Sequence, residues 1–136
     1  VLFLSVATNA LGHDGATGVV KERMEYFKQS KNNLKAIKAH IARKNYESII
    51  PLAIEIRDWA GKMTKYFPEG SGVDPSEAAP EVWSDFEGFE KAALLHFDAA
   101  NKLISSAKSK NQKNIVEAFG ITASTCKSCH QLYRVD

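Results

Sequence analysis

Apolar side chains recur along most of this chain at the spacing of α-helices, and no segment reads as a convincing strand. The clearest case covers residues 16–44, where apolar residues return every seven positions with three others interleaved. The residues on this stripe are Val20, Arg23, Phe27, Ser30, Leu34, Ile37 and Ile41. A stripe of this width is typical of a helix that packs in a bundle.

Three further segments show the same periodicity, over about 47–66, 80–108 and 111–134. Polar turns, "RKN" and "KSKNQK", separate the first helix from the second and the third from the fourth. The stretch "FPEGSGVDPSEAAP", residues 67–80, is the only one rich in proline and glycine, and it predicts one long loop. Four amphipathic helices joined in this way predict an all-α fold, an antiparallel four-helix bundle.

Composition limits the class of protein further. The 136 residues suffice for one domain, and 44% hydrophobic with 25% charged residues is ordinary for a soluble globular protein. A net charge of +2 gives no argument for binding nucleic acid or an anionic membrane. Away from the start of the chain, no apolar run approaches the roughly 18 residues of a membrane span.

The first twelve residues differ from the rest. "VLFLSVA" followed by small residues resembles the end of a signal peptide, with cleavage near Ala10 or Gly12, although an apolar arm packed on the domain is the alternative. We therefore expect residues 1–12 to be a signal remnant or arm, residues 13–136 to form the bundle, and the protein to reside in the periplasm.

The candidate chemistry lies in "CKSCH", Cys126 to His130. A C-x-x-C-H run is the attachment signature of a c-type haem. On a helix, positions i, i+3 and i+4 share a face. Cys126 and Cys129 are therefore predicted to form thioethers with one porphyrin, and His130 to be the axial ligand of its iron.

Three other interpretations of the motif explain less. Zinc sites normally need four ligands, and this chain has no second cysteine pair. A thioredoxin-like dithiol expects a βαβ context. A disulfide would leave His130 without a role. Because both cysteines lie on the apolar stripe of the last helix, we expect whatever they hold to be inside the bundle.

Four stretches together resemble the cytochrome c′ family and its Met-ligated, six-coordinate relatives. They are "HDGATGVVKERMEYFKQ", "YFPEGSG", "APEVWSDFEGF" and "CKSCHQLYR". The resemblance implies one haem c on Cys126, Cys129 and His130, with Arg23 near a haem propionate and Arg134 beside the proximal face. The position of Arg23 in an apolar stripe agrees, since a buried guanidinium needs an anion. Arg134 could equally be a solvated cation at a helix C-terminus.

The sixth coordination position departs from the Met-ligated relatives. They place their methionine four residues after the helix-one arginine, where this chain has Phe27, which cannot ligate iron. Met24 lies on the same side of the first helix as Lys31 and Lys38, which follow it at intervals of seven residues. We therefore expect Met24 to flank the core. The prediction is a five-coordinate iron, with a Met24-ligated cytochrome as the alternative. We expect Met63 to pack in the second helix, His13 to lie in the arm, and His40 and His96 to lie on helix surfaces.

The resemblance implies electron transfer, with nitric oxide or carbon monoxide able to bind the iron. A weak peroxidase would need a distal acid–base group, which Phe27 does not supply, so we do not expect an enzyme. The redox partner is not indicated by the sequence, although the lysine-rich surface could dock an acidic one. A homodimer through the first two helices is expected, using Met24, Tyr26 and Ile49.

Overall fold

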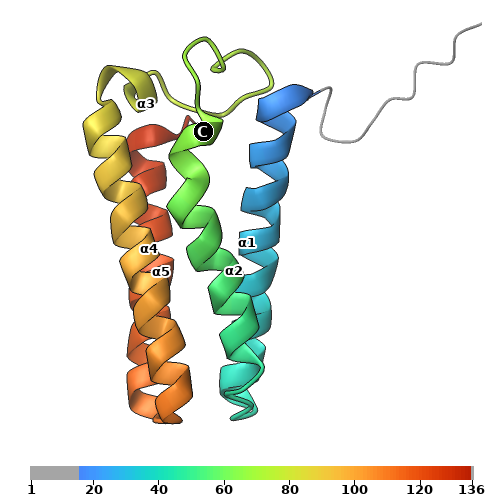
Figure 1. The fold of residues 1–136 in the computed structure, drawn as a ribbon, viewed down its shortest axis with the longest axis vertical. Helices are drawn as coiled ribbons and strands as arrows, with labels where there is room; N and C mark the ends of the chain where they lie inside the picture. Colours follow the sequence, from blue (N-terminus) through green and yellow to red (C-terminus); the bar gives the residue numbers. More distant parts are fainter. Residues whose placement is uncertain (1–15, 136) are drawn as a thin grey trace, which may run out of the picture.

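The computed structural model describes residues 16–135, and its regular structure there is helical. The helices are α1 (Gly18–Ala42), α2 (Ile49–Lys62), the 3₁₀ helix η1 (Met63–Tyr66), α3 (Glu81–Ser84), α4 (Phe86–Ser109) and α5 (Gln112–Tyr133) (Figure 1). The predictions for residues 1–12 and for His13 fall outside the described residues.

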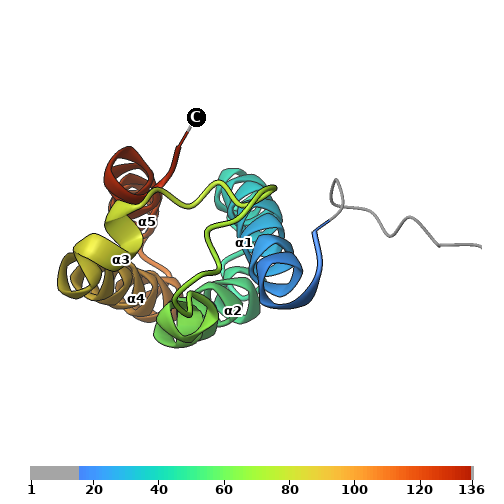
Figure 2. The same cartoon turned by 90° about the horizontal axis from the view of Figure 1, so that it is seen from above.

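Four long helices form the predicted antiparallel bundle. Viewed end-on, α1 lies beside α2, α2 beside α4, and α4 beside α5 (Figure 2). α1 and α5 contact each other much less than these neighbouring pairs do. The predicted loop, residues 67–80, crosses over one end of the bundle between η1 and α3. In the described part of the chain, no helix is long and apolar enough to cross a membrane.

The third predicted helix is interrupted. At Asp85 the backbone leaves the helical region, with φ −128° and ψ 53°, so residues 80–108 form α3 and α4 instead of one helix. The Asp85 carboxylate accepts a hydrogen bond from the Gly88 backbone N–H at 3.3 Å and thus caps α4. It also accepts one from the Tyr133 hydroxyl at 2.8 Å. The second predicted helix is also shorter than expected, because its last turn tightens into η1.

The bundle has two cores of different composition. The core near the two short turns, called the aliphatic half here, consists of Ile37, Ile41, Ile49, Ala53, Ile56, Ala100, Leu103, Ile104, Ala107, Ile115 and Ala118. The core under loop 67–80, called the aromatic half, has the buried residues Trp59, Met63, Phe67, Val82, Phe89, Ala93 and Tyr133. Tyr26, Phe27, Tyr66 and other partly buried residues pack against the aromatic half.

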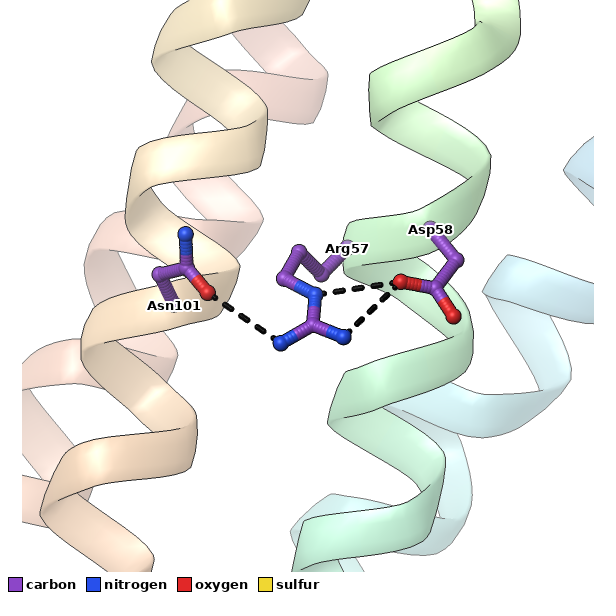
Figure 3. A network of polar contacts seen from close by, with 3 residues as sticks. All are labelled: Arg57, Asp58 and Asn101. Carbon is purple, nitrogen blue, oxygen red and sulfur yellow. Dashed lines mark hydrogen bonds and ion pairs between the residues drawn. The ribbon is translucent and has the colours of Figure 1, made fainter.

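A polar contact on the surface joins two neighbouring helices. Arg57 on α2 donates to the Asp58 carboxylate at 2.9 and 3.1 Å and to the Asn101 side-chain oxygen on α4 at 3.5 Å (Figure 3). These side chains are solvent-accessible, so the contribution to stability is expected to be below about 1 kcal/mol. The α2–α4 interface is therefore held chiefly by its buried apolar residues.

One sequence-based prediction about surfaces is wrong, and another is met only in part. Ile49 is fully buried in the aliphatic half, because the first residue of α2 already faces the core, so it cannot belong to a dimer surface. His40 on α1 is only half-buried, but its Nδ1 atom is fully buried and has no partner among residues 16–135.

Candidate functional site

The two cysteines lie one turn apart on α5, half-buried and not joined by a disulfide. Burial raises the pKa of each thiol to about 11, and at Cys126 the neighbouring Cys129 adds to the rise. Both are therefore neutral thiols at neutral pH, unlike the low-pKa thiolate of a redox-active dithiol. This argues against the thioredoxin-like interpretation.

His130 follows one residue after Cys129, and its ring faces the ring of Phe27. The two ring centroids are 6.5 Å apart, with an angle of 67° between the planes. Although the residue as a whole is exposed, partial burial of the imidazole lowers its pKa. Arg134 lowers it further and Glu77 opposes the shift. His130 is thus held toward the neutral form, the form that ligates metals.

Phe27 lies on the core side of α1, as the stripe predicted. Its ring makes edge contacts with Trp59 at 5.3 Å and with Phe67 at 6.4 Å, besides the contact with His130. Met24, three residues earlier, is half-buried. The side chain of α1 that the structure sets opposite His130 is therefore the phenyl ring.

Arg23 is buried, with 3% of its surface exposed, and is surrounded by neutral acceptors. Its guanidinium donates to the Tyr66 carbonyl, to the hydroxyl and carbonyl of Ser71, and to the Ser76 hydroxyl, at 2.6–2.9 Å. It also lies 4.2 Å from the centre of the Phe67 ring. The ion pairs among residues 16–135 do not include Arg23, and burial lowers its pKa.

Trp59 on α2 is a second buried donor at this end of the bundle. It is 3% exposed, and its indole Nε1–H has no hydrogen-bond partner in the described part of the chain. The sequence placed Trp59 on the apolar stripe of the second helix and gave no signal of an unpaired donor.

The expectation that His96 lies on the surface is wrong. It is 6% exposed on α4, its Nδ1 lies 2.8 Å from the Thr125 hydroxyl, and both ring nitrogens lie 3.8 Å from the Cys126 sulfur. Burial, with a smaller contribution from His130, lowers the pKa of His96 to about 4. Its position three residues after Ala93 and seven after Phe89 was a signal that it faces inward.

Arg134 follows the last helical residue, is exposed, and forms an ion pair with Glu77 at 2.7 Å. Main-chain bonds fasten the same segment to loop 67–80: Ala79 N–H donates to the Tyr133 carbonyl at 2.9 Å, and Val135 N–H to the Glu77 carbonyl at 2.8 Å. The solvated-cation interpretation of Arg134 therefore fits this structure, with an electrostatic influence on His130 besides.

The comparison with known families decides the class. The family model for cytochrome c′ matches residues 18–134, which is most of the chain. This chain belongs to the cytochrome c′ family. That family is one of the standard examples of the four-helix bundle. The cofactor of the family is covalently bound haem c, and this chain is accordingly a c-type haem protein.

Individual relatives agree with the family match. Cytochrome c′ of Rhodospirillum rubrum is 37% identical over 71 residues, which is 52% of this chain and 48% of that protein, so the matched region spans about half of the relative. Cytochrome c-556 of Agrobacterium tumefaciens is 32% identical over 122 residues, covering 87% of this chain and 98% of that protein.

Solved structures of cytochromes c′ have the same fold. One, described as having an unusual ligand-controlled dimer dissociation, matches with a TM-score of 0.81 at 26% identity, covering 87% of this chain and 95% of that one. A nitric oxide complex of a variant of the protein from Alcaligenes xylosoxidans matches with a TM-score of 0.77 at 21% identity, covering 87% and 94%.

The residues of this chain fit a haem. Two neutral thiols and an imidazole occupy one face of α5, and an aromatic side chain lies opposite the imidazole. Arg23 supplies a buried cation that has no anion among residues 16–135, which suits the carboxylates that a haem carries. Sequence reasoning found these residues, but it missed Ser71 and Ser76, which hold the guanidinium from the loop.

Proposed function

We propose that this protein transfers electrons in the periplasm, and that its haem iron has a single protein ligand and binds nitric oxide or carbon monoxide. When bound, the haem supplies one-electron exchange between ferrous and ferric iron and a coordination position for a diatomic gas. The observation that carries the proposal is the phenyl ring of Phe27 opposite the imidazole of His130.

Each site residue has a stated role in this proposal. Cys126 and Cys129 would hold the haem through thioethers, and His130 would ligate the iron through its neutral imidazole. Arg23 pairs with a haem carboxylate while the loop serines fix the orientation of its guanidinium. Arg134 is a cation beside the proximal face that favours the neutral form of His130.

The environment of Phe27 supports gas binding over peroxidase chemistry. Its ring neighbours, besides His130, are Trp59 and Phe67, and neither can donate or accept a proton as a general acid–base catalyst. Apolar surroundings of this kind favour small uncharged ligands over water and anions. The solved nitric oxide complex of a variant of cytochrome c′ from Alcaligenes xylosoxidans, a protein with the same fold, lends further support.

The absorption spectrum of the ferrous protein tests the ligation. We expect a high-spin, five-coordinate spectrum and binding of carbon monoxide without loss of a protein ligand. Phe27→Met should convert the iron to low spin and raise its reduction potential, as His/Met ligation does. Phe27→Leu is the matched control and should stay high-spin. A low-spin spectrum of the unmodified protein that Met24→Ala abolishes would establish the six-coordinate alternative.

Two finer parts of the proposal concern location and assembly. Export through residues 1–12 would leave a chain that begins near Ala10 or Gly12, which the intact mass of the protein isolated from the periplasm would reveal. A homodimer stays a prediction, with Met24 and Tyr26 on α1 as its candidate residues. Sedimentation at micromolar concentration that gives only a 15.0 kDa species would exclude the dimer.

A further inference from the structure

Acidic side chains gather at the end of the bundle that loop 67–80 covers. Residues 69–90, which include most of this loop, α3 and the start of α4, contain seven acidic residues and no lysine or arginine. All seven are exposed, and this surface is called the acidic end: Glu69, Asp74, Glu77, Glu81, Asp85, Glu87 and Glu90. Its ion pairs among residues 16–135 are Glu77 with Arg134 and Glu87 with Lys91, so most of its negative charge faces solvent.

The opposite end of the bundle carries the opposite charge (Figure 1). Residues 35–44 and 99–113 flank the two short turns and contain eight lysines and arginines and no acidic residue. All eight are exposed, and they form the basic end: Lys35, Lys38, Arg43, Lys44, Lys102, Lys108, Lys110 and Lys113. The 24 residues of α4 separate the two ends by about 36 Å, at about 1.5 Å per residue. The net charge of +2 therefore conceals two surfaces of opposite sign.

The haem-binding residues lie at the acidic end. α5 ends at Tyr133 under loop 67–80, where the Ala79 N–H donates to the Tyr133 carbonyl. Cys126, Cys129 and His130 belong to about the last two turns of this helix. A protein that exchanges electrons with a haem held there has to approach the acidic end, because the basic end lies several helical turns away.

Exposed apolar side chains accompany the acidic residues. Val73 in the loop is 65% exposed, Leu132 on α5 is 63% exposed, and Val135 is 45% exposed. The Val135 N–H donates to the Glu77 carbonyl, which holds the end of the chain against the loop. Interfaces of transient electron-transfer complexes bury less than about 1,200 Å² and combine apolar contacts with a polar rim. The acidic end offers both components.

We propose that the acidic end is the docking surface for a redox partner protein that presents lysine and arginine side chains. The inference rests on the proposed function, since it assigns a partner to the electron transfer. It differs from the acidic partner that the lysine-rich surface suggested, because most of those lysines lie toward the other end. A second copy of this chain fits less well. Its basic end would meet the acidic end head to tail, and such contacts extend into filaments unless they close into a ring.

The first experiment compares two one-electron acceptors of opposite charge by stopped-flow absorption. The haem-loaded ferrous protein is mixed with ferric mitochondrial cytochrome c, which is lysine-rich, or with an acidic plastocyanin, and one electron passes to the acceptor's metal. We expect the rate constant with cytochrome c to fall as salt is added and that with plastocyanin to rise, since salt screens attraction and repulsion alike. The reverse pattern would overturn the inference.

Charge-neutralising variants locate the docking surface. Glu69→Gln/Glu81→Gln removes two charges from the acidic end and should slow the reaction with cytochrome c about fivefold at about 0.1 M ionic strength. The matched control, Lys38→Gln/Lys108→Gln, removes two charges from the basic end, beyond the screening length of about 10 Å at this ionic strength, and should change the rate less than about twofold. An unchanged rate in the first variant, or equal changes in both, contradicts docking at the acidic end.

Carbodiimide cross-linking measures the contact without relying on electron transfer or on any variant. The reagent forms an amide between a carboxylate of one protein and a lysine amine of the other, and it takes up the released water as a urea. Mass spectrometry of the product with cytochrome c should find the lysines joined to carboxylates within residues 69–90. Cross-links confined to other carboxylates of this chain would overturn the inference. So would cross-links between copies of this chain alone, since a second copy would then occupy the acidic end.

A small redox mediator separates this inference from the function on which it rests. If the purified protein carries no haem, or its iron exchanges no electron with the mediator, the proposed electron transfer fails as well. If the iron is reduced and reoxidised by the mediator but the two protein acceptors show no opposite dependence on salt, only the inference about the partner fails.

Discussion

The two halves of the bundle are built from the same long helices but differ in what they need to be complete. The aliphatic half is filled by Ile, Leu and Ala side chains, many with no exposed surface, and these side chains pack against one another. In or beside the aromatic half, the described residues offer no anion to the buried guanidinium of Arg23 and no acceptor to the indole N–H of Trp59, and His96 lies beside the Cys126 thiol. The described residues of the aliphatic half thus leave no such group unpaired in its core, whereas those of the aromatic half leave polar groups without a partner of their own.

The largest expected effect is the loss of covalently bound haem. Replacing both cysteines, Cys126→Ala with Cys129→Ala, deletes both thioether positions, so acid–acetone extraction should release all of the haem, whereas the unmodified protein should retain it. Cys126→Ala alone is the control, because one thioether should remain. Haem that extracts from the unmodified protein would contradict covalent attachment.

A core truncation in the aliphatic half should change stability and leave the site intact. Leu103 is fully buried, and Leu103→Ala is expected to lower the free energy of unfolding by about 2–5 kcal/mol. Denaturant titration measures this change, while the absorption spectrum should stay as it was. Leu95→Ala on the same helix is the matched control, since Leu95 is 62% exposed and its removal should change stability by less than about 0.5 kcal/mol. A spectrum altered by Leu103→Ala would show that the halves are coupled.

A smaller effect, confined to acid pH, concerns His96, one turn along α4 from Ala93 of the aromatic half. Its pKa in the folded protein is about 4, below the usual 6.5, because burial disfavours the charged imidazole. The unfolded chain therefore binds the proton first, and stability should fall as the pH decreases from about 6.5 to about 4, by up to about 3 kcal/mol. His96→Gln, which can still contact Thr125, should flatten this decline in denaturant titrations at several pH values. An unchanged decline would assign it to other groups.

Local periodicity was enough to predict the bundle, the positions of Cys126, Cys129 and His130 on one face, and Phe27 on the core side of α1. It failed where a side chain's partner lies far away in the sequence. The break at Asp85 is joined by a hydrogen bond from Tyr133, 48 residues later, and the Arg23 guanidinium is bound by Ser71, also 48 residues later. The sequence also could not predict that the Trp59 N–H lacks a partner among residues 16–135, because apolar periodicity indicates only which residues face inward. These are features of contact between distant segments, which the spacing along one helix does not contain.

Gly88 is the residue on which one of these long-range contacts depends. A Cβ atom at this position would collide with the Asp85 carboxylate and the Tyr133 hydroxyl, which meet each other beside it. The hydrogen bond, the cap of α4 and the absent side chain therefore form one arrangement. In an alignment of related sequences, positions 85, 88 and 133 should covary: a relative with a larger residue in place of Gly88 should also lack either the carboxylate or the phenol.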